Sequence, residues 1–248
     1  MQKQEFETII SEQLALFKSL KEEFIGKQQY EIGANLRGIE KYLINIQKVI
    51  EEEKNGKSPS SIKFQPWVGD NYKNENPKIL VLGESHYGNA DANKEIFTQN
   101  VIKSLALRIQ GRHRFFTMVA KTLLNKTNYW LNDDDSKELW NKVSFYNYIQ
   151  DFVGDKSRTR PQQYMWEEAR KPFQEVLEIL NPDIIIVTGK ELGNYIKRDI
   201  ENFENKIFCF WPHPSGFGGF DYQKSLEDFK IALNELDNRK SKNKVNLK

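Results

Sequence analysis

Four short apolar runs, separated by segments with helical spacing, constrain the fold of this chain more than any other feature. The runs are Lys78–Leu82, Val143–Tyr148, Asp183–Gly189 and Lys206–Pro212. Strands that are apolar on both faces are typical of parallel sheets covered by helices on each side. Helices are expected at about 94–125, 166–180, 190–200 and 221–236. We therefore predict an α/β fold, a three-layer α/β/α sandwich with a four-stranded, mostly parallel sheet.

The N-terminal residues 1–55 have a different pattern, with two apolar stripes at helical spacing. The stripes consist of Phe6, Ile10, Leu14, Phe17, Leu20 and Phe24, and of Ile32, Leu36, Ile39, Leu43, Ile46 and Ile50. This spacing predicts an antiparallel helical hairpin. The hairpin must bury its stripes against each other, the main domain, a second copy of the chain or a protein partner. A polar linker at 56–66, an α/β domain at 67–238 and a basic flexible tail at 239–248 complete the expected organisation.

Composition narrows the class of protein. Apolar residues make up 38% of the 248 residues and charged residues 29%, and no apolar run is long enough to span a membrane. Cys209 is the only cysteine, so neither an intrachain disulfide nor a cysteine-ligated iron–sulfur cluster is possible. A reducing, cytoplasmic location is the expectation. The net charge of +2 neither requires nor excludes a nucleic-acid partner.

Polar residues follow the predicted strands, where a parallel sheet usually binds its ligand. The sequence GESHYG occupies Gly83–Gly88 after the first run, and Asn147 lies near the end of the second. The sequence WPHPSGFGGF, at Trp211–Phe220, follows the fourth. We expect these side chains to converge on one pocket.

This order of motifs resembles the uracil-DNA glycosylase superfamily over about residues 64–236. That family has a first motif of the form Gly-Gln-Asp-Pro-Tyr-His or Gly-Glu-Ala-Pro-Gly after its first strand, and His-Pro-Ser after its last. Here Gly83–Gly88 takes the first position and His213-Pro214-Ser215 the second, and Asn181–Ile196 looks like the family's third strand and following helix.

The resemblance implies roles for the residues of the base pocket. His213 would donate a hydrogen bond to the departing base, whose negative charge develops as the glycosidic bond breaks. Asn147 would read the edge of the flipped base, and Tyr87 would exclude a thymine methyl group. The other residues placed in the base pocket are Gly83, His86 and Phe116, with either Phe115 or Phe116 as the stacking partner if the two are not simply the apolar face of a helix.

The resemblance also implies contacts to DNA. Ser215 would bind a phosphate, and Phe217, in a glycine-rich loop, would fill the gap left by the flipped base. Arg158 and Arg160 would hold the backbone. No cofactor and no metal ion are implied, and the predicted reaction is hydrolysis of the base–sugar bond that leaves an abasic site.

The first motif departs from the family at two positions. Ser85 replaces the Asp that orients or activates water in the most efficient uracil enzymes, and His86 replaces the Pro. Glu84 is a candidate for the missing carboxylate, so the catalytic candidates are His213, Glu84 and Ser85. Uracil is the plainest substrate, and a modified base, including the bulky bases of some phages, is the alternative. The role would then be phage defence rather than DNA repair.

Other readings of the same residues stay open. A serine hydrolase would use Ser85 as nucleophile and His213 as base, but Tyr87 stands where a nucleophile elbow needs glycine. A metal site would have to use His86, His113, His213 and Glu84, whose spacing fits no standard motif. A non-catalytic nucleic-acid binder or defence protein on a glycosylase fold is kept open by Ser85.

Overall fold

The computed structural model divides into two compact units, Met1–Ser60 and Ser61–Lys248. The described residues are 12–13, 15–16, 18–19, 43–44, 60–88, 92, 94–156, 159–198, 203, 206–215 and 219–245. In the first unit the described residues before Ser60 are all helical. Most of the predicted hairpin lies outside the described residues and remains a prediction. Of the predicted linker, residues 56–59 also lie outside them, whereas residues 61–66 belong to the second unit, in which Ile62 and Phe64 are buried.

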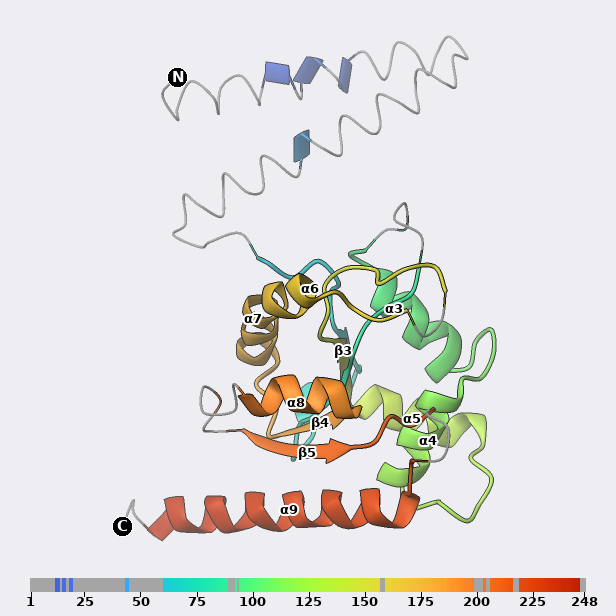
Figure 1. The fold of residues 1–248 in the computed structure, drawn as a ribbon, viewed down its shortest axis with the longest axis vertical. Coiled ribbons are helices and arrows are strands. Elements are labelled where there is room, and N and C mark those ends of the chain that lie inside the picture. The colour runs from blue at the N-terminus through green and yellow to red at the C-terminus, as the bar shows by residue number, and fades with distance from the viewer. Residues whose placement is uncertain are drawn as a thin grey trace. The chain divides into compact units, whose positions relative to one another are not determined.

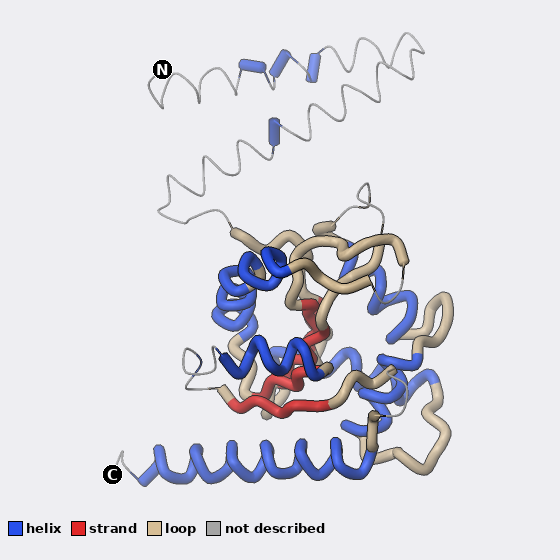
Figure 2. The backbone as a smooth tube through the Cα atoms, in the orientation of Figure 1, coloured by secondary structure: helices blue, strands red, loops and turns tan. Residues whose placement is uncertain are grey.

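The second unit is built on a mixed sheet, drawn in red in Figure 2. Its strands are β1 (Trp67–Val68), β2 (Ile79–Gly83), β3 (Ser144–Asn147), β4 (Ile184–Thr188) and β5 (Ile207–Trp211). They lie in the order β1-β3-β2-β4-β5, and every neighbouring pair is parallel except β1 and β3. The predicted α/β class and the mostly parallel sheet are confirmed, and each of the four apolar runs contains a strand.

The helices of this unit cover both faces of the sheet (Figure 1). They are α3 (Phe97–Val101), η2 (Ile102–Ala106, a π-helix), α4 (Arg114–Leu123), α5 (Asp133–Lys142), α6 (Gln163–Glu168), α7 (Arg170–Leu180), α8 (Lys190–Arg198) and α9 (Tyr222–Val245). One core cluster joins the sheet to η2, α4, α5 and α9, and a second joins it to α6, α7 and α8. Side chains alternate along each strand, so that Ile186 enters the first cluster and Ile185 the second.

The prediction of four strands was wrong, because the sheet has a fifth. β1 has only two residues and pairs antiparallel with β3, with Trp67 opposite Phe145. Trp67 Nε1 donates to the carbonyl of Trp140 at 2.8 Å, which anchors this edge from a side chain. A two-residue strand is too short to show a periodic pattern in the sequence.

The prediction of helices was wrong in two places. The continuous helix expected at about 94–125 is broken between η2 and α4, where Arg108 has a left-handed φ of 62°. A helix was missed at α5, which begins after the N-cap Asn132. The Asn132 Oδ1 atom accepts from the Asp135 N–H at 2.7 Å, and three aspartates fill the first turn. These are ordinary helix-start signals.

The last helix is longer than predicted. α9 packs against β5 and continues to Val245, into the segment for which a flexible tail was expected. Its last turns carry an i,i+4 ion pair between Arg239 and Glu235, with Nη2 and Oε1 2.6 Å apart. Such pairs support a solvated helix. In the described part of the chain, no helix is long and apolar enough to cross a membrane.

The order of strands places a crevice at the carboxyl end of β2. The chain leaves β2 for β3 on one side and later returns to β4 on the other side of β2. Ligands of open α/β sheets bind at such a switch point.

Candidate functional site

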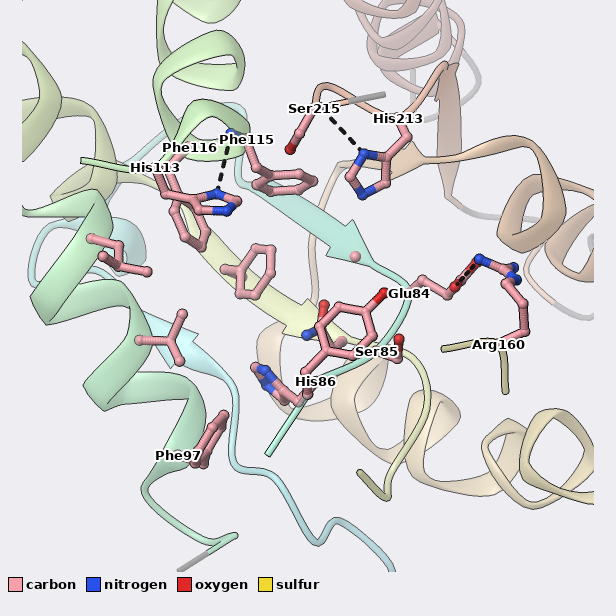
Figure 3. Close-up of a pocket in the computed structure, with 16 residues that line it drawn as sticks. Glu84, Ser85, His86, Phe97, His113, Phe115, Phe116, Arg160, His213 and Ser215 are labelled. Atoms are coloured by element: carbon pink, nitrogen blue, oxygen red, sulfur yellow. Dashed lines mark hydrogen bonds and ion pairs between the residues drawn. The ribbon is translucent and has the colours of Figure 1, made fainter. Parts of the chain in front are cut away.

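A cavity of about 540 Å³ lies at this crevice, beneath α4 and beside α3 and η2 (Figure 3). Its lining residues are Gly83, Glu84, Ser85, His86, Tyr87, Phe97, Val101, Leu105, His113, Phe115, Phe116, Phe145, Asn147, Arg160, His213 and Ser215. The chain contains three histidines in all, and every one of them lines this cavity. That concentration makes the cavity the principal candidate site.

Part of the cavity wall is a close contact between β2 and β3. Gly83 is paired in register with Asn147, which is 5% exposed. A Cβ atom on Gly83 would lie 2.1 Å from Asn147 Oδ1, so only glycine leaves room for this amide. The absence of a Cβ atom on Gly83 therefore leaves space for the Asn147 side chain at the end of β2, where this residue lines the cavity with an amide that carries both a donor and an acceptor.

His213 follows β5 and reaches the cavity from the opposite side. Its Nδ1 atom accepts a hydrogen bond from the Ser215 N–H at 3.2 Å. Burial of the ring lowers the pKa of His213, and the nearby His113 and Arg160 lower it further. The imidazole is therefore neutral at pH 7, and because Nδ1 is an acceptor, its proton is on Nε2. His213 offers a neutral hydrogen-bond donor to the cavity.

The Oγ atom of Ser215 is buried, in the loop that holds this ring. It has no hydrogen-bond partner among the described residues. A buried hydroxyl without a partner is costly.

Aromatic rings form the wall between the sheet and α4. The Phe115 ring lies 5.5 Å from that of His213 and 5.2 Å from that of Phe116, measured between centroids. Phe116 in turn packs edge-on to Phe145 at 5.6 Å. Phe115 and Phe116 are both buried. The wall presents the apolar surface that a planar ring would need.

Glu84 belongs to a charged network at the rim of the cavity. Arg160 grips its carboxylate through two nitrogens, with N–O distances of 2.8 and 2.9 Å, and also pairs with Glu191. Burial raises the pKa of Glu84, and Arg160 partly offsets that rise. Figure 3 shows the Glu84 side chain extended toward Arg160. The Glu84 carboxylate is therefore held in an ion pair with Arg160.

The remaining residues of the first motif differ in exposure. His86 is 5% exposed, and its Nε2 atom lies 2.9 Å from Thr98 Oγ1. Burial lowers the pKa of His86 to about 3, so the ring is neutral and held in place. Tyr87 is 38% exposed, and Ser85 is partly buried at the cavity wall.

Ten of the twelve residues predicted for the site line the cavity together. They are Gly83, Glu84, Ser85, His86, Tyr87, Phe116, Asn147, Arg160, His213 and Ser215. The other two, Arg158 and Phe217, lie outside the described residues. Lining the cavity does not test the role that was assigned to each residue.

Six further residues line the cavity beyond the ten that were predicted. They are Phe97, Val101, Leu105, His113, Phe115 and Phe145. Phe97, Val101 and Leu105 recur every fourth residue, which is the spacing of a single helix face and was interpreted only as packing. As a site residue, His113 was considered only for the alternative metal site; the structure places it immediately before α4, which it caps.

The described residues bear on two of the alternative readings. Among them, no group of three or more His, Cys, Asp or Glu side chains is arranged to hold a metal ion. The hydrogen bond found at His213 Nδ1 comes from the Ser215 N–H. A serine hydrolase needs its histidine to be oriented toward the nucleophile by a third group, and this bond instead connects the ring to its own loop.

In comparisons with known proteins, no family model matches the chain and no curated protein matches it.

Proposed function

We propose that the chain is a DNA glycosylase that hydrolyses the bond between a flipped base and its deoxyribose. The observation that carries this proposal is a neutral imidazole donor, an immobilised amide and an aromatic wall in one cavity, supplied by His213, Asn147 and Phe115–Phe116. Recognition of a flipped base requires those three elements: a polar edge, a stacking surface and a donor for the leaving group. Uracil is the first candidate base.

The proposed reaction is a substitution at the anomeric carbon. The bond from C1′ to the base nitrogen breaks, and the electron pair leaves with the base. Water then forms the new bond to C1′, its released proton balances the charge of the departing base, and an abasic sugar remains. The His213 Nε2–H stabilises the negative charge that develops on a carbonyl oxygen of the base. The neutral Nε2–H is suited to this role because it donates a hydrogen bond to the anion while the imidazole keeps its proton.

The structure changes the role proposed for Glu84. Because Arg160 binds both carboxylate oxygens, Glu84 is better suited to fix the loop after β2 than to activate water. Arg160 shares its charge with two carboxylates, and this pairing makes it less suited to bind a phosphate. We propose that the Ser85 hydroxyl helps to hold the attacking water.

The test is an abasic-site assay on labelled single- and double-stranded oligonucleotides containing uracil. Cleavage by alkali at the uracil position, abolished in His213→Ala, is the expected result. Oligonucleotide binding is measured in parallel, because His213→Ala should bind normally. A panel with 5-substituted pyrimidines follows if uracil is not released.

A non-catalytic nucleic-acid binder is the second candidate, and one observation favours it. Glu84 is the only carboxylate among the described residues that line the cavity, and Arg160 binds it, so it is not free to act on water. If the wild type binds oligonucleotides yet releases no base from the whole panel, this function replaces the first.

A further inference from the structure

His113 has the same arrangement as His213 and lies on the opposite side of the Phe115 ring (Figure 3). It is the N-cap of α4, and its Nδ1 atom accepts from the Phe115 N–H at 3.3 Å. The proton of the neutral ring is therefore on Nε2. The ring lies 5.7 Å from that of Phe116, so the two imidazoles and two phenyl rings form one continuous wall.

The surroundings favour the neutral form of His113. Burial lowers its pKa, and the positive end of the α4 dipole disfavours an imidazolium at this position. Arg112 and Arg114 flank it in the sequence, and His213 faces it across Phe115. Each imidazole thus supplies one Nε2–H donor, and neither supplies a charge.

We propose that His113 is a second hydrogen-bond donor to the ligand and that the pair selects a pyrimidine with carbonyl oxygens on both sides of N3. The identity of this ligand class rests on the proposed function. A 2,4-dioxopyrimidine presents an acceptor, a donor and an acceptor along one edge. His213, Asn147 and His113 supply the complementary donor, acceptor and donor. In cytosine a 4-amino group replaces one carbonyl oxygen. This amino group is a hydrogen-bond donor and would face the donor of a histidine, so the two could not form a hydrogen bond.

Capping of α4 and donation to the ligand are separable by substitution. In His113→Asn the side-chain oxygen still accepts from the Phe115 N–H, because asparagine is a good N-cap, but the shorter side chain does not reach the cavity. In His113→Gln the amide nitrogen extends to about the position of Nε2. In His113→Ala both functions are lost.

The kinetic test compares these variants by kcat/KM for base release. Loss of one neutral hydrogen bond costs about tenfold. We expect this loss in His113→Asn with unchanged thermal stability, and partial recovery in His113→Gln. Wild-type activity in His113→Asn would show that the ring is only a cap and would overturn the proposal.

A second test needs no turnover and therefore separates this inference from the proposed function. The full-length chain is labelled with ¹⁵N-histidine, and its three imidazoles are followed while free uracil or free cytosine is added. We expect uracil to shift the Nε2 signals of His113 and His213 more than that of His86, and cytosine to have a weaker effect. That result supports the inference even if no oligonucleotide is cleaved. If uracil leaves His113 unshifted, the inference fails, including when the glycosylase assay succeeds.

Discussion

The two sides of the cavity satisfy their polar side chains in opposite ways. On one side, Glu84, Arg160 and Glu191 satisfy one another as ions. On the other, His113 and His213 are neutral, and each uses Nδ1 to bind its own backbone. On the charged side the ions bind one another within the protein, whereas on the imidazole side each ring keeps its Nε2–H as a donor for a ligand. The difference indicates that the charged side holds the loop and the imidazole side acts on the ligand.

After loss of His213 itself, the largest effect is expected from Gly83→Ala, which displaces the Asn147 amide in the cavity and leaves the ion pairs of Arg160 in place. The new methyl group would lie 2.1 Å from Asn147 Oδ1 and must displace that amide. Base release should fall about 100-fold or more, because small displacements in a site are that costly. The free energy of unfolding should fall by about 1–3 kcal/mol.

Gly111→Ala is the matched control for Gly83→Ala. A Cβ atom there would meet only Leu105 Cδ2, at 3.9 Å, which is an ordinary contact. Kinetics and urea unfolding of both variants check the prediction, and normal base release by Gly83→Ala would contradict the assigned role of Asn147.

Arg160→Met should lower the free energy of unfolding more than substitutions at His113 or His213 do. It leaves the Glu84 carboxylate, whose side chain is 13% exposed, without its partner. Since Arg160 is itself 52% exposed, we expect a loss of about 1–2 kcal/mol at pH 7. The double variant with Glu84→Gln should recover most of it.

The stability deficit of Arg160→Met should depend on pH, in a direction that follows from the pKa of Glu84. Burial already raises the pKa of Glu84 in the folded state, and loss of Arg160 raises it further. A carboxyl group with a raised pKa destabilises the fold while it is ionised, so Arg160→Met should regain stability as the pH falls through that pKa. Urea unfolding between pH 7 and 5 measures this. A deficit that does not change with pH would refute the explanation.

His86 should have no effect on stability at pH 7 and should affect it only in acid. Its folded-state pKa is about 3, against an ordinary value of 6.5. The unfolded chain therefore binds a proton that the folded chain refuses, and stability falls as the pH drops from 6.5 toward 3. The slope from this residue approaches about 1.4 kcal/mol per pH unit.

Replacing His86 by Phe and its partner Thr98 by Val removes this titration without leaving a buried hydroxyl unpaired. The pH profile of unfolding should be flatter by one proton over that range. An unchanged slope would show that His86 does not titrate as described.

The smallest effect is expected outside the cavity, at Trp130. It is 75% exposed, whereas Trp67, Trp140, Trp166 and Trp211 are buried. Trp130→Phe should change the unfolding free energy by about 0.5 kcal/mol or less and leave base release unchanged. It should also remove most of the tryptophan fluorescence that acrylamide quenches. A large loss of activity would place part of the function outside the cavity.

The sequence predicted the α/β class because buried parallel strands leave continuous apolar runs, and it located the cavity because strand ends converge. Ten predicted residues share the cavity for that reason. β1 could not be found, since a two-residue strand carries no pattern. The position of His113 as the N-cap of α4 could not be predicted, because its orientation depends on where α4 begins. Glu84 and Arg160 lie 76 positions apart in the sequence, and no local sequence pattern predicts a contact between them.

The central claim is that His213 stabilises a base as it leaves the sugar. The most direct measurement is the single-turnover rate of uracil release from an oligonucleotide by the wild type and by His213→Ala, with the dissociation constant measured alongside. The account predicts a rate about 100- to 1,000-fold lower in the variant with unchanged binding, as expected for loss of one preorganised donor. Equal rates in the two proteins, or release of no base by the wild type, would contradict it.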